Sequence, residues 1–142
     1  LSLELGGKSP FIVYEDADLD AVVEGVVDAI WFNQGQVCCA GSRLLVQEGV
    51  ADAFHRKLRA RMDRLRVGDP LDPATQQGAV ISYAHRDKIL GYVGLARQEG
   101  GKIQCGGGIP ENLPERCKSG AFVAPTVVTD LAPACRVNQE EV

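Results

Sequence analysis

The first third of the chain alternates between apolar runs and helical spacing. Ser9 to Tyr14 is a short apolar run that predicts a buried strand, and acidic residues follow it. Apolar positions then recur every three or four residues as far as Ile30. With Asp16 or Asp18 as the N-cap, this spacing predicts a helix that ends near Asn33.

The middle of the chain predicts one more strand and two more helices. Leu44 to Gln47 is a short apolar run, and residues 50–66 carry an apolar stripe with basic residues on the other faces. We interpret that basic face as a solvated surface, with anion binding as the alternative. A third helix is predicted for residues 83–99, where Ser82 is the cap and Gly100 the stop.

The last third predicts shorter and less regular elements. Two glycines inside the third helix, Gly91 and Gly94, are expected to allow close packing. Residues 102–107 predict a strand and a glycine turn, 109–120 a polar surface loop, and 121–131 a strand broken at its proline. Helices that alternate with continuous apolar strands are typical of an α/β fold, with a mainly parallel sheet covered by flanking helices.

Length and charge narrow the class of protein. A chain of 142 residues predicts one domain, and 45% hydrophobic residues are typical of a globular protein. The net charge of −4 argues against a nucleic-acid partner. No apolar run approaches the ~20 residues that a membrane helix needs. The chain opens without Met and stops without a cap, so we expect it to be part of a longer protein.

The five cysteines are odd in number and include no Cys-x-x-Cys pair. Neither histidine lies near a cysteine at the spacing of a zinc site, so no metal site is predicted. Free thiols indicate a reducing compartment. We therefore expect a cytoplasmic location, and the mitochondrion remains the alternative because a leader could precede the chain.

The first stretch that contains candidate catalytic residues is LELGGKSP, Leu3 to Pro10. Glu4 lies between two leucines, and a carboxylate buried in an apolar strand suits general-base work near neutral pH. An edge-strand glutamate that faces water is the alternative. The two glycines that follow would let a ligand or another backbone approach closely.

The second such stretch is WFNQGQVCCAGSR, Trp31 to Arg43. If a helix begins near Gln36, Cys38 lies in its first turn, where a thiolate is favoured and the main-chain N–H can stabilise an oxyanion. Packing as a small apolar residue is the alternative. The local pattern does not choose between Cys38 and Cys39.

These two stretches together resemble the hydrolytic branch of the aldehyde dehydrogenase superfamily. The family has a glutamate in an E-L-G-G-K segment and a cysteine in G-Q-x-C-x-A, and both occur here with Cys38 placed 34 positions after Glu4. VGDPLD, KILGYV, PTVVTD and the final EEV are also similar to the family's catalytic domain. The resemblance covers residues 1–142. It implies a partial catalytic domain, with the nucleotide-binding domain before it and a C-terminal segment after it.

The resemblance implies that Cys38 is the nucleophile and Glu4 the general base. An aldehyde would be oxidised to a carboxylic acid through a thiohemiacetal and a thioester, which water activated by Glu4 hydrolyses. Trp31 stands where many relatives have Phe or Tyr, so we expect it to change the substrate tunnel. The alternatives are a thiol esterase that uses the same cysteine, and a non-catalytic fragment or pseudoenzyme. The 142 residues alone are expected to be inactive.

The resemblance also implies a cofactor and partners. Glu141 matches the glutamate that holds the ribose on the nicotinamide side, and Lys88, Leu5 and Gly6 are further candidates for cofactor contacts. The cofactor is expected to be NAD, with NADP as the alternative. A small aldehyde is the expected substrate. The full-length protein is expected to be a homo-oligomer, a dimer or a tetramer, without nucleic-acid or membrane partners.

Overall fold

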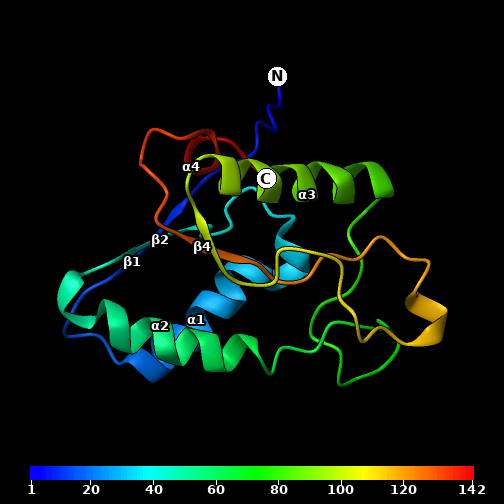
Figure 1. Cartoon of the computed structure of the whole chain (residues 1–142), viewed down its shortest axis with the longest axis horizontal. Helices are drawn as coiled ribbons and strands as arrows, with labels where there is room; N and C mark the ends of the chain where they lie inside the picture. Colours follow the sequence, from blue (N-terminus) through cyan, green and yellow to red (C-terminus); the bar gives the residue numbers. More distant parts are fainter. The chain divides into compact units, whose positions relative to one another are not determined.

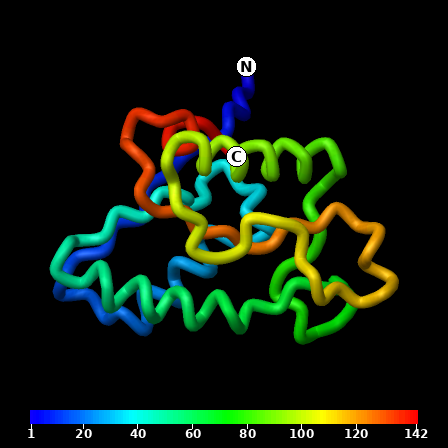
Figure 2. The backbone as a smooth tube through the Cα atoms, viewed as in Figure 1, coloured from blue at the N-terminus to red at the C-terminus, as the bar shows by residue number.

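The computed structural model describes all 142 residues, which form two compact units. The first unit contains residues 1–64 together with Glu141, and the second contains 65–140 together with Val142. Figure 2 traces the chain through the first unit in blue to green and through the second in green to red. No helix combines the length and the apolar character that crossing a bilayer requires.

The first unit is a parallel strand pair packed with two helices (Figure 1). Its elements in order are β1 (Pro10–Val13), α1 (Leu19–Trp31), the 3₁₀ helix η1 (Phe32–Gly35), β2 (Arg43–Val46) and α2 (Glu48–Met62). β1 and β2 pair in parallel over four residues each, and α1 packs against α2. A parallel pair needs a crossover connection, and α1 provides it.

The helices of the first unit follow the predicted apolar stripes. Asp18 is the N-cap of α1, because its carboxylate accepts a hydrogen bond from Asp20 N at 3.0 Å. The buried side chains of the two helices are Val23, Val26, Val27, Trp31, Phe54, Leu58 and Met62. Ion pairs link the outer faces, with Lys57 Nζ 2.5 Å from the carboxylate of Asp20. Part of the basic face of α2 is thus neutralised by α1.

The second unit is less regular. It contains α3 (Tyr83–Gln98), β3 (Lys102–Cys105), the 3₁₀ helix η2 (Glu115–Cys117), β4 (Val127–Thr129) and α4 (Arg136–Gln139). β3 and β4 pair in an antiparallel ladder with an irregularity in register. Figure 2 shows how the chain leaves β3, forms a long loop and returns beside itself.

The α/β fold is confirmed, and the structure refines its details. β1 and β2 form a parallel pair, whereas β3 and β4 are antiparallel because the loop between them folds the chain back. The cap at Ser82 is confirmed by its 3.1 Å hydrogen bond from His85 N. The close packing expected at Gly91 and Gly94 is wrong, since a Cβ at either position would meet nothing within 4 Å.

The expected strand over residues 121–131 is shorter than predicted. Only Val127–Thr129 forms β4, although Ala121, Phe122 and Val123 are buried. Phe122 packs with Leu113 and Cys117, which lie in the loop predicted to be a polar surface. Residues 121–123 are therefore apolar because they are buried in the core, although they form no strand.

Candidate active site

The N-terminal segment that carries Glu4 has no regular structure. Residues 1–9 belong to no strand, so the strand expected around Glu4 is wrong, and Glu4 is exposed. The end of the segment is nevertheless fixed, because Arg43 donates from Nε to Lys8 O at 2.7 Å and from its backbone N to Ser9 O at 3.2 Å. These bonds extend the β1–β2 pairing towards the glycines.

Gly6 and Gly7 lie close to two other predicted site residues, Glu141 and Cys38. A Cβ added at Gly7 would lie 3.0 Å from the carbonyl carbon of Cys38 and would overlap its oxygen. Gly6 has φ of 76°, and a Cβ added there would lie 2.7 Å from Cδ of Glu141. At Gly7 the clash is with backbone atoms, and at Gly6 the positive φ disfavours a residue with a side chain, so both positions favour glycine. The Gly6-Gly7 segment thus lies against the backbone of Cys38 and the carboxylate of Glu141.

Both cysteines occupy a tight turn. Ala40 N donates to Val37 O at 3.0 Å, so Cys38 and Cys39 are the two central residues of a four-residue turn. Both are exposed. The helix considered to begin near Gln36 is wrong, because η1 ends before it and no helix follows until α2. A tight turn, and not the first turn of a helix, therefore holds both thiols.

The residues before the turn adopt a backbone that ends the helix. Asn33, Gln34 and Gly35 have φ of 48°, 59° and 78°. Left-handed backbone costs a residue other than glycine about 1–2 kcal/mol. Two hydrogen bonds hold it in place, from Asn33 Nδ2 to Gln36 O and from Gln36 N to Asn33 O, each at 3.1 Å. This strained segment sets the direction in which the chain enters the cysteine turn.

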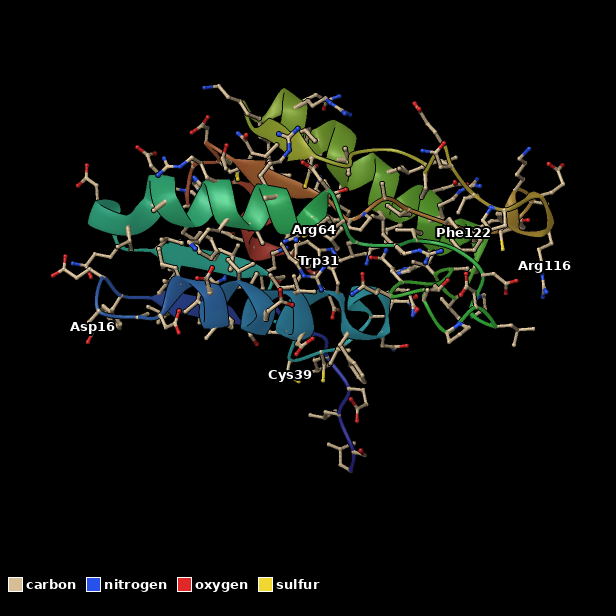
Figure 3. The ribbon with its side chains drawn as sticks, turned by 90° about the horizontal axis from the view of Figure 1, so that it is seen from below. Asp16, Trp31, Cys39, Arg64, Arg116 and Phe122 are labelled. Carbon is tan, nitrogen blue, oxygen red and sulfur yellow. The ribbon has the colours of Figure 1, made fainter.

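The far end of the turn is anchored in the core of the first unit. Gly41 N donates to Ala29 O at 3.1 Å, and a Cβ at Gly41 would lie 3.2 Å from Cβ of Phe11. Figure 3 shows Cys39 at the outer border of this unit. The backbone N–H of Cys38 makes no hydrogen bond within the protein. An anchored turn therefore presents an exposed thiol together with an available N–H donor.

The aromatic residue exposed next to this turn is Phe32 rather than Trp31. Trp31 is only 9% exposed, whereas Phe32 is 72% exposed. Figure 3 shows Trp31 towards the interior of the first unit. The sequence contained the signal, because Trp31 lies four residues after Val27 and eight after Val23, on the buried stripe of α1. Trp31 is therefore part of the core of this unit, and Phe32 is the exposed aromatic residue beside the turn.

The remaining cofactor candidates differ in their surroundings. Leu5 is 85% exposed beside the Gly6–Glu141 contact. Lys88 belongs to the second unit, on α3, where its Nζ lies 5.8 Å from the centroid of the Tyr92 ring. This cation–π contact gives Lys88 a local structural role.

A charged cluster in the second unit surrounds Glu140. Arg136 donates from Nε and Nη2 to the carboxylate at 2.8 and 3.0 Å, and Tyr92 Oη lies 2.5 Å from it. The hydrogen bonds from Arg136, then those from Tyr92, hold the pKa of Glu140 down at about 2. The same contact raises the pKa of Tyr92. Glu140 is therefore an ion-paired carboxylate in this unit.

Comparison with known proteins agrees with the fold. An α/β scaffold in this chain holds a cysteine turn against a Glu-Leu-Gly-Gly segment. The model of the "Aldehyde dehydrogenase family" matches residues 1–142. The chain therefore belongs to the aldehyde dehydrogenase family.

Individual relatives are similar over nearly the whole chain. Betaine aldehyde dehydrogenase of Rhizobium etli is 41% identical over 142 residues, which is 100% of this chain and 28% of that protein. Among solved structures, betaine aldehyde dehydrogenase of Staphylococcus aureus in complex with NAD+ has a TM-score of 0.92 at 41% identity, covering 97% of this chain and 27% of the other. PnpE from Pseudomonas sp. WBC-3 has a TM-score of 0.91 at 44% identity, covering 97% and 28%. The chain thus spans little more than a quarter of these relatives.

Proposed function

We propose that this chain supplies the nucleophile and the general base of an NAD-dependent aldehyde dehydrogenase, which oxidises an aldehyde to a carboxylic acid. The observation that carries the proposal is the contact of Gly7 with the Cys38 backbone, because it joins the two signature stretches. The proposal gives Cys38 rather than Cys39 the role of nucleophile, on the basis of the G-Q-x-C-x-A pattern.

In the first step, the Sγ of Cys38 attacks the carbonyl carbon of the aldehyde. The carbonyl oxygen becomes an oxyanion, and the N–H of Cys38 is available as a donor to it. The turn suits this role because its own hydrogen bond runs between Val37 and Ala40 and leaves the Cys38 N–H unused. The exposed ring of Phe32 offers an apolar surface for the aldehyde's side chain.

In the last step, Glu4 accepts a proton from a water molecule, which attacks the thioester carbon and releases the acid and the Cys38 thiol. Glu4 precedes Gly7 by three residues, so its Cα lies within about 11 Å of the Gly7 Cα by chain length alone. Its exposure in this chain leaves it accessible to water.

The residues around Gly6 fit a dinucleotide cofactor. The Glu141 carboxylate is exposed and lies over Gly6, where the missing side chain leaves space for it. A carboxylate accepts hydrogen bonds from the two hydroxyls of a ribose, so Glu141 would hold the sugar, with Leu5 and Gly6 beside it. When bound, NAD would supply the hydride acceptor for the carbon attached to Cys38. We keep Lys88 as a further cofactor contact, and NADP as the alternative cofactor.

The whole protein is proposed to be longer than this chain. The 28% coverage of relatives supports the view that residues 1–142 are part of a catalytic domain. Its nucleotide-binding domain and C-terminal segment would lie outside, and the assembly would be a homo-oligomer. The names of the relatives make betaine aldehyde the first substrate to test.

The test measures aldehyde-dependent NADH formation by the protein in its natural length. Cys38→Ala should reduce turnover to background, whereas Cys39→Ala should largely retain it. Glu4→Gln should release one equivalent of NADH and then stall, because the thioester forms but is not hydrolysed. Full turnover by Cys38→Ala would refute the assignment of the nucleophile. Ester hydrolysis by Cys38 without any oxidation of aldehydes would favour the esterase alternative instead.

A further inference from the structure

The cysteine turn holds two thiols where the proposed reaction uses one. Cys38 and Cys39 are consecutive, both are exposed, and both occupy the central positions of the same turn. The other three cysteines differ, because Cys117 is buried while Cys105 and Cys135 are partly buried. A pair of accessible neighbouring thiols is a bidentate ligand for soft electrophiles.

Direct bonding between the two sulfurs is unfavourable. Consecutive Cα atoms are about 3.8 Å apart, whereas disulfides usually join Cα atoms about 4.4–6.8 Å apart. A disulfide between Cys38 and Cys39 would therefore close a strained ring. Inserting one larger atom between the sulfurs adds a member to that ring and relieves the strain, and both thiol side chains can rotate because they are exposed.

We propose that Cys38 and Cys39 form a dithiol site for trivalent organoarsenicals, R–As(OH)₂. Two As–S bonds form and two As–O bonds break. Each hydroxide leaves with one thiol proton as water, so two waters are released and the arsenic remains trivalent. The reaction needs no oxidant or reductant. It uses the exposed pair of thiols and does not depend on the assignment of Cys38 as a nucleophile.

The second As–S bond is intramolecular, which makes the adduct resistant to single thiols. A neighbouring thiol acts at an effective concentration in the millimolar range or above, so the pair should hold the arsenical at least about tenfold more tightly than one cysteine does. A small dithiol can match this advantage and remove the arsenical, whereas a monothiol cannot. One consequence rests on the proposed function: the adduct occupies Cys38 and should block aldehyde oxidation.

The probe is phenylarsine oxide, added to the folded protein in its natural length. Intact mass should rise by the mass of phenylarsine oxide minus one water, which equals its hydrated form PhAs(OH)₂ minus two waters. The adduct should be stable to 2-mercaptoethanol and removed by 2,3-dimercaptopropanol. Protection from iodoacetamide should map to both cysteines of the tryptic peptide 9–43. These readouts do not require catalysis, so they separate this proposal from the proposed function.

Matched variants identify the site. Cys39→Ser should lower resistance to the monothiol at least tenfold and, because Cys39 is outside the proposed chemistry, retain aldehyde oxidation. Cys135→Ser should change neither property. A monothiol-resistant adduct that persists in Cys39→Ser, or one that forms only after the protein is denatured, would overturn the proposal.

Discussion

Replacing Gly7 by alanine tests the contact that joins the two signature stretches. The new Cβ would lie 3.0 Å from the carbonyl carbon of Cys38, which is shorter than the 3.4 Å at which ordinary contacts begin. The carbonyl oxygen of Cys38 would be closer still. That oxygen belongs to the backbone, so a rotation of a side chain cannot relieve the overlap. The Gly7 segment and the cysteine turn must separate by roughly 1 Å, a displacement that can lower a rate by about 100-fold.

The assay is steady-state aldehyde oxidation by the protein in its natural length, together with its thermal unfolding. We expect Gly7→Ala to lower kcat/KM by about 100-fold and to destabilise the fold by about 1–3 kcal/mol, as overpacking does. Gly91→Ala is the matched control, because a Cβ there meets nothing within 4 Å. Wild-type activity in Gly7→Ala would show that the contact does not position Cys38, and the proposed arrangement of the site would fail.

Three further changes test the fold itself. Phe54 is fully buried, so Phe54→Ala should cost about 3–5 kcal/mol in urea unfolding; a loss below 1 kcal/mol would contradict its place in the core. Gly94→Ala should stabilise α3 by up to about 1 kcal/mol, seen as a higher Tm, because the position is open and helical. The pKa of Glu140 is lowered from 4.5 to about 2, mainly by Arg136. The contribution of the Glu140 carboxylate to the stability of the fold is therefore complete above pH 4.5 and is lost as the pH falls through about 2. The Tm difference between wild type and Glu140→Gln should therefore vanish at the acid end, and a constant difference would refute the role of the Arg136 ion pair.

Local patterns predicted the helices well because each helix has its own stripe and cap. Asp18 and Ser82 both cap helices as expected, and α3 begins at the predicted residue. The errors concern segments whose structure depends on distant parts of the chain. The apolar residues around Glu4 suggested a strand, but strands require a partner, and this segment has none in the chain. The burial of Trp31 follows from its position on the apolar stripe of α1, and its expected effect on a substrate tunnel stays a prediction.

The sequence by itself determined the elements and the identity of the chemical groups, because capping, helical periodicity and the two signatures are properties of short segments. It also contained Cys38 and Glu4, 34 positions apart, without a physical reason to bring them together. Only the tertiary structure decided that Gly7 packs on the Cys38 backbone, that Glu141 lies over Gly6, and that the cysteines occupy a turn instead of a helix. These are contacts between segments distant in sequence, and their geometry follows from the pairing of β1 with β2 and the left-handed run at Asn33, which no local pattern encodes.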